Sequence, residues 1–217
     1  MQKEKQKSFC IAVCLLTAFV LWTLAVRFVD VQTIGPQNTT VGFASLNQFI
    51  HTLFGVHLTL YTLTDWLSLL PLGFVLGFAC LGLVQWIRRK HFFLVDRSIL
   101  ILGVFYVIVM AAFCLFEVLV INYRPVLIDG HLEASYPSST TLLVLCVMPT
   151  AAMQLRMRIK NRSCRQWFTF LITVFTAFMV IARLISGVHW FTDIIGGILL
   201  STGLVSLYYA IITKAKL

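Results

Sequence analysis

Two arginines and a histidine–aspartate pair are the residues of this chain best suited to chemistry. Arg124 follows an apolar stretch, Arg183 closes another, and His189 and Asp193 come soon after it. On a helix His189 and Asp193 would share a face, so the carboxylate would accept one imidazole N–H and fix the tautomer. The other ring nitrogen is then free to act as a base or nucleophile. Because arginine is the preferred planar partner of phosphate oxygens, the set suits phosphoryl transfer through a histidine.

Further polar residues precede the fourth of the chain's long apolar segments. His131 lies in a short loop after Arg124, and Ser138 and Ser139 stand where the apolar segment begins. The free amides at a helix N-terminus attract an anion, and a serine hydroxyl adds another ligand. The alternative is that these groups only cap helices and close one end of a helix bundle.

The spacing of these residues resembles three signatures of the phosphatidic acid phosphatase type 2 superfamily. Arg183-x5-His189-x3-Asp193 resembles the third signature, which is the most specific of them. Arg124-Pro125 resembles the end of the first, and the segment 137–140 looks like a degenerate form of the second, Pro-Ser-Gly-His. The resemblance is close over the last four apolar segments, with the core signatures at 117–193, and covers the first two only by architecture.

The resemblance implies a role for each matched residue. His189 would attack phosphorus and carry a phosphohistidine, and Asp193 would orient and polarise it. The phosphoryl oxygens would be held by Arg124, Arg183, Ser138 and Ser139. The implied mechanism uses no metal and no cofactor, because the arginines neutralise the developing charge.

Two positions depart from the family pattern. The family places a lysine seven residues before the arginine of its first signature, where this chain has Glu117. A carboxylate there removes a phosphate ligand and adds repulsion, or pairs with an arginine. Thr140 replaces the histidine that ends the second signature, and a threonine cannot protonate a leaving group near neutral pH. Either activity is weak, or His131 substitutes, or the leaving group is itself a phosphate and needs no proton.

The elements that position these residues are apolar and long. Of 217 residues, 59% are hydrophobic and 12% charged, which excludes an ordinary soluble domain and a disordered chain. A bilayer core needs about 20 apolar residues per helix. Lipid offers no partner to backbone amides, so the segments must be helical. The sequence therefore predicts an all-α integral membrane protein, a single domain over 1–217, with spans near Phe9–Ala25, Leu67–Trp86, Ile99–Ile121, Ser139–Leu155, Trp167–Ile185 and Trp190–Ile212.

The formal net charge of +9 predicts the orientation of the bundle. Fourteen of the 17 basic residues fall in segments that six spans place on one side. The positive-inside rule then puts both termini in the cytoplasm. Because membrane orientation accounts for these basic residues, we expect no nucleic-acid partner. Only Arg27, Arg124 and Arg183 remain for the other face. From the compact size we expect a bacterial plasma membrane, with the active site on the extracytoplasmic side.

The segment between the first two spans is the longest external one. Its part from Val41 to Leu63 is moderately apolar, and we expect a helix that lies in the membrane interface. His51 and His57 in this part are six residues apart, a poor spacing for two metal ligands on one helix face, so we expect no metal site.

These observations predict a lipid phosphatase that hydrolyses a phosphomonoester or diphosphate lipid at the outer leaflet. Its partners would be membrane lipids and a lipid phosphate or polyprenyl diphosphate substrate. The main alternative is a catalytically weak or inactive relative that binds a lipid phosphate or a partner protein. A small transporter or channel subunit is a third hypothesis, but it would require polar residues through the middle of the helices.

Overall fold

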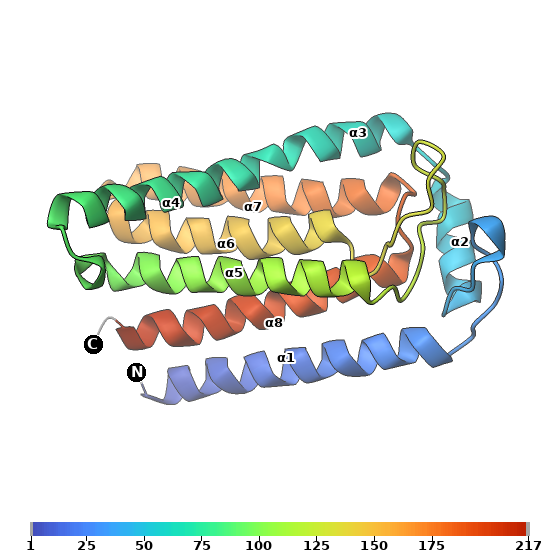
Figure 1. Cartoon of the computed structure of the whole chain (residues 1–217), viewed down its shortest axis with the longest axis horizontal. Helices are drawn as coiled ribbons and strands as arrows, with labels where there is room; N and C mark the ends of the chain where they lie inside the picture. Colours follow the sequence, from blue (N-terminus) through green and yellow to red (C-terminus); the bar gives the residue numbers. More distant parts are fainter. Residues whose placement is uncertain (1, 216–217) are drawn as a thin grey trace.

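The computed structural model describes the backbone of residues 2–215 and the side chains of residues 6–213, and long helices dominate it (Figure 1). Among the described residues the extended segments form only isolated β-bridges. Two short 3-10 turns occur at Pro36–Asn38 and Phe92–Leu94. The α-helices are α1 (Gln2–Phe28), α2 (Ala44–Phe54), α3 (Leu58–Leu67), α4 (Leu69–Arg89), α5 (Arg97–Val118), α6 (Ser139–Arg158), α7 (Arg162–Ile185) and α8 (Phe191–Ala215).

Six helical stretches of the described chain are long and apolar enough to cross a bilayer. This confirms the all-α membrane fold and the number of spans that the sequence predicts. The second stretch combines α3 and α4 and is longer than expected, at 32 residues. The stretches are Gln6–Phe28, Leu58–Arg89, Arg97–Val118, Ser139–Arg158, Arg162–Ile185 and Phe191–Thr213.

α6 and α8 form the centre of the bundle. In the most apolar part of these two spans 56% and 50% of the residues are buried, against 11–28% in the other four. The exposed apolar surfaces of those other four spans are therefore available to lipid. α1 packs along α8 (Figure 1). A side chain at Gly203 of α8 would meet Leu16 of α1 at 2.8 Å, so the glycine allows this close approach.

Both ends of the described chain lie at the same end of the bundle (Figure 1). The basic residues at the end of α4, the start of α5 and the α6–α7 connection lie at this end as well. Lys216 lies outside the described residues, as do the side chains of Lys3, Lys5 and Lys214. That this end faces the cytoplasm stays a prediction.

The segment Val41–Leu63 differs from the single helix expected there. The chain turns at Gly55, which has a φ of 72°, and α2 and α3 are therefore separate. α2 lies across the end of the bundle opposite the termini, whereas α3 runs on towards α4 (Figure 1). The break at Ser68 follows from Pro71, whose ring clashes with the backbone carbonyl four residues earlier. The position of α2 in the membrane interface stays a prediction.

Candidate active site

The polar residues singled out in the sequence gather at the end of the bundle opposite the termini. Four segments meet there: the end of α5, the loop 119–138 that leads into α6, the turn 186–190 after α7, and the start of α8 (Figure 1). The fold thus brings together residues that are far apart in the chain, and it buries Arg124, Ser138, Arg183, His189 and Asp193.

His189 presents one ring nitrogen without a hydrogen-bond partner. Its Nδ1–H donates to the backbone carbonyl of Ser135 at 3.1 Å, which leaves the lone pair on Nε2. Nε2 is buried and has no partner. Asp193 does not make the bond expected from the sequence, because its Oδ2 lies 3.8 Å from Nδ1, too far for a hydrogen bond. The tautomer is therefore set by a carbonyl of the loop before α6.

Asp193 holds the start of α8 instead. Its Oδ2 accepts the backbone N–H of Trp190 at 2.9 Å, three residues earlier, as the carboxylate of a capping box does. Its Oδ1 accepts from the side-chain amide of Asn122 at 3.2 Å. Asp193 thereby joins the turn that carries His189 to the loop that carries Arg124.

The surroundings of His189 keep its imidazole neutral. Burial lowers the pKa of His189 well below its ordinary value, and the positive charges of Arg124 and Arg183 lower it further. The hydrogen bond to Ser135 opposes this shift without reversing it. A neutral imidazole with a free Nε2 is the form that acts as a nucleophile.

Arg124 and Arg183 both form cation–π contacts with the ring of Tyr61. The guanidinium carbon of Arg183 lies 4.6 Å from the ring centre of Tyr61, and that of Arg124 lies 5.7 Å from it. Arg183 also donates from Nη1 to the hydroxyl of Thr64 at 3.1 Å, and Arg124 forms an ion pair with Glu133 at 3.0 Å. Both cations keep a buried N–H group without a hydrogen-bond partner, Nη1 of Arg124 and Nε of Arg183.

The start of α6 contributes Ser138 and Ser139 in different ways. Ser138 is the N-cap of α6, but its side chain makes no capping bond, and its Oγ accepts from Thr141 at 3.1 Å. The N–H of Ser138 is already used, because it donates to the carbonyl of Asp193 at 3.1 Å. Ser139 lines the cavity beside His189. The free amides expected here are therefore those of the first turn, from Ser139 onward.

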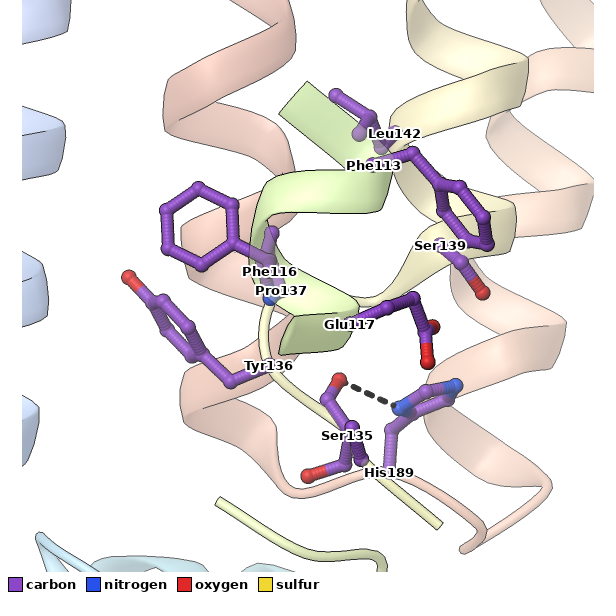
Figure 2. A pocket seen from close by; sticks show the side chains of 10 residues that line it. Phe113, Phe116, Glu117, Ser135, Tyr136, Pro137, Ser139, Leu142 and His189 are labelled. Carbon is purple, nitrogen blue, oxygen red and sulfur yellow. Dashed lines mark hydrogen bonds between the residues drawn. The ribbon is translucent and has the colours of Figure 1, made fainter. Parts of the chain in front are cut away.

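A cavity of about 10 Å³, room for roughly one water molecule, lies between these elements. Figure 2 shows Glu117 and Ser139 turned towards the imidazole of His189 across it. Thr140 is buried and does not line this cavity. His131 is exposed, pairs with Ile128 across the two-residue turn 129–130, and does not line the cavity either.

One expectation from the sequence was that Glu117 could pair with an arginine, and the structure does not show this ion pair. Among the described side chains Glu117 forms no ion pair, and the carboxylate bound to Arg124 is that of Glu133. The described side chains also contain no group of three or more His, Cys, Asp or Glu residues able to hold a metal ion.

α2 packs against the site and stabilises it, a contact that the sequence did not predict. The side chain of Asn47, fully buried, accepts the backbone N–H of Thr192 at 3.2 Å and donates to its hydroxyl at 3.0 Å. His51 donates from Nε2 to the carbonyl of Gly187 at 3.2 Å. These bonds hold the turn 186–190 and the start of α8 against α2. An asparagine placed before an apolar run carries no signal of such a distant partner.

Comparison with known proteins finds a family match in the C-terminal part of the chain. Residues 118–217 match the model of the PAP2 superfamily. The match confirms the resemblance seen in the signatures, and the five buried residues of the site lie inside it. None of the curated proteins compared with the chain matches it significantly.

The fold agrees with that of a solved PAP2 protein. The chain is similar to the crystal structure of a transmembrane PAP2 type phosphatidylglycerolphosphate phosphatase from Bacillus subtilis, with a TM-score of 0.66 and 19% sequence identity. The similarity covers 94% of this chain and 96% of that protein. It therefore extends the PAP2 fold to α1 and to the segment before residue 118. The fold that the two chains share is that of a transmembrane helix bundle.

Proposed function

We propose that this protein is a membrane phosphatase that hydrolyses a phosphomonoester or diphosphate lipid at the outer leaflet through a phosphohistidine. One observation carries the proposal. The buried side-chain atoms without a hydrogen-bond partner at this end of the bundle include Nε2 of His189, Nη1 of Arg124 and Nε of Arg183. A buried polar atom without a partner is costly and rare. A nucleophilic nitrogen beside two cationic donors is complementary to a phosphoryl group.

In the first step the lone pair on Nε2 attacks phosphorus. The N–P bond forms, the P–O bond to the leaving group breaks, and its electron pair stays on the departing oxygen. Arg124 and Arg183 stabilise the charge on the phosphoryl oxygens. The carbonyl of Ser135 holds Nδ1–H throughout, so the ring keeps one tautomer while it gains positive charge. In the second step water attacks phosphorus, the N–P bond breaks and phosphate leaves.

The leaving group narrows the substrate class. Thr140 and His131 do not line the cavity beside His189, so neither is placed to protonate an alkoxide. A phosphate leaving group departs without a proton. This favours a diphosphate lipid, such as a polyprenyl diphosphate, over a phosphatidic acid.

The leaflet follows from the distribution of charge. The site lies at the end opposite the termini and the basic connections (Figure 1). If those connections face the cytoplasm, as the positive-inside rule predicts, the site faces the outer leaflet of a bacterial plasma membrane.

Phosphate release by the purified protein in detergent tests the proposal. We expect turnover with undecaprenyl diphosphate, and less with phosphatidic acid and phosphatidylglycerol phosphate. The variant His189→Ala should lose it, while His131→Ala, at an exposed position outside the cavity, should retain it. Turnover that persists in His189→Ala would exclude His189 as the nucleophile.

A relative that binds a lipid phosphate without turnover is the second candidate. The ion pair of Arg124 with Glu133 and the carboxylate of Glu117 at the cavity favour it, because both reduce the positive charge available to phosphate. It predicts saturable lipid binding and no phosphate release, so any His189-dependent turnover excludes it.

A further inference from the structure

We infer that Glu117 is the general base that activates the water which hydrolyses phosphorylated His189. The inference rests on the proposed function and assigns a proton acceptor to its second step. Its basis is the placement of Glu117, on the last turn of α5, in the cavity of His189 (Figure 2).

The lining of the cavity leaves few other candidates for a proton acceptor. Besides Glu117 and His189 it consists of apolar side chains, Ser135, Ser139 and Tyr136. The hydroxyl of Tyr136 is hydrogen-bonded to Thr23 at 2.7 Å, on the side of α1. A serine hydroxyl is a weak base. Among the cavity side chains, the carboxylate is thus the group suited to take a proton from water.

The other carboxylates of the site are engaged elsewhere. Both oxygens of Asp193 accept hydrogen bonds, from Trp190 and Asn122, and Asp193 does not line the cavity. Glu133 is bound to Arg124 and does not line it either. Glu117, by contrast, forms no ion pair among the described side chains and lies near the end of its span.

The hydrolytic step involves water, the carboxylate of Glu117 and phosphorylated His189. One O–H bond of the water breaks and its proton goes to the carboxylate of Glu117. The water oxygen forms a bond to phosphorus, the N–P bond breaks, and its electron pair returns to Nε2 of His189. Inorganic phosphate leaves, and Glu117 releases the proton to solvent. Glu117 takes no part in the first step, which requires a leaving group that departs without a proton.

A carboxylate at this position also differs from the lysine of the family pattern in what it can do to water. An ammonium group binds phosphate oxygens but has no lone pair to accept a proton. A carboxylate repels the phosphate dianion, yet it orients and deprotonates the attacking water.

The test separates the two chemical steps. Wild type, Glu117→Gln, Glu117→Asp and Asp129→Asn are purified in detergent and mixed with a polyprenyl diphosphate that carries ³²P on its terminal phosphorus. Rapid quench then measures labelled protein, which should be acid-labile as phosphohistidine is, and steady-state assays measure released phosphate. Asp129→Asn is the matched control, because it makes the same change at an exposed position of the 128–131 turn outside the cavity.

We expect Glu117→Gln to release phosphate roughly 100- to 10,000-fold more slowly, the usual range for a lost general base. It should still become labelled at the wild-type rate and should accumulate close to one label per protein. Glu117→Asp should recover part of the rate, and Asp129→Asn should match wild type.

Two results would overturn the inference while the proposed function stands. One is phosphate release from Glu117→Gln within threefold of wild type. The other is a variant that loses release without accumulating label, which would mean that Glu117 acts in binding or in the first step. Failure of the proposed function looks different, because then wild type itself shows neither label nor release, or shows both without dependence on His189.

Discussion

Replacement of Asn47 tests whether α2 positions the catalytic turn. Asn47 is fully buried and makes three hydrogen bonds, to the carbonyl of Gly42 at 2.8 Å and to the hydroxyl and N–H of Thr192 at 3.0 and 3.2 Å. Thr192 is the second residue of α8 and precedes Asp193 directly. Asn47→Ala leaves the Gly42 carbonyl and the Thr192 N–H without these partners, and each buried group left unpaired costs about 1–3 kcal/mol.

The free energy of unfolding should therefore fall by about 2–6 kcal/mol in Asn47→Ala. At roughly 2–4 °C per kcal/mol for a chain of this size, the melting temperature in detergent should drop by at least about 4 °C. Turnover should fall roughly 100-fold, because the start of α8 carries the turn of His189 with it and a displacement near 1 Å has that effect. Asn47→Asp keeps an acceptor at a helix N-terminus and loses only the donor bonds, so its losses should be smaller.

The assays are thermal unfolding followed by light scattering and steady-state phosphate release, with Gln48→Ala as the control. Gln48 is the next residue of α2 and is exposed. If Asn47→Ala melts and turns over like Gln48→Ala, α2 does not support the site and the reasoning is refuted.

Two further predictions concern His189 and the turn before it. The pKa of His189 is lowered on folding, so below pH 6.5 the unfolded chain binds a proton that the folded chain does not. The free energy of unfolding should therefore decrease as the pH is lowered below 6.5, by at most about 1.4 kcal/mol per pH unit. Unfolding measured at pH 5 and pH 7 should show this slope, His189→Asn should lack it, and an NMR titration of His189 near 6.5 would contradict it. Gly187 has a φ of 69°, and a Cβ there would lie 2.0 Å from the carbonyl oxygen of Gly55, so Gly187→Ala should separate α2 from the turn and lower the melting temperature and turnover. Gly73→Ala, where a Cβ meets nothing within 4 Å, is the control and should do neither.

The architecture was largely predictable because lipid allows few alternatives. Apolar segments that cross a bilayer must be helical, so the number of spans can be read from hydropathy. Their boundaries were less certain. The helix expected over Val41–Leu63 is divided at Gly55, because a break of this kind depends on backbone conformation and on docking against Gly187 rather than on hydropathy.

The residues of the site were predictable where the chemistry depends on residue type and short spacing. Arg183, His189 and Asp193 lie within one turn and the helix ends beside it, so their proximity follows from the chain itself. Their partners were not predictable. Tyr61 and Thr64 reach Arg183 from α3, and Thr64 is 119 residues away along the chain. No local pattern marks a residue for a contact of that separation.

The sequence by itself determined the membrane class of the protein and its six spans, and it marked the candidate residues for phosphoryl transfer, because each of these depends on hydropathy or on residue types at short range. The tertiary structure alone decided which groups those residues contact. The Ser135 carbonyl, not Asp193, fixes the tautomer of His189, and Glu117 rather than Thr140 or His131 faces its cavity. These assignments depend on how α5, α6 and α8 pack against one another, and packing between distant segments leaves no trace in local spacing.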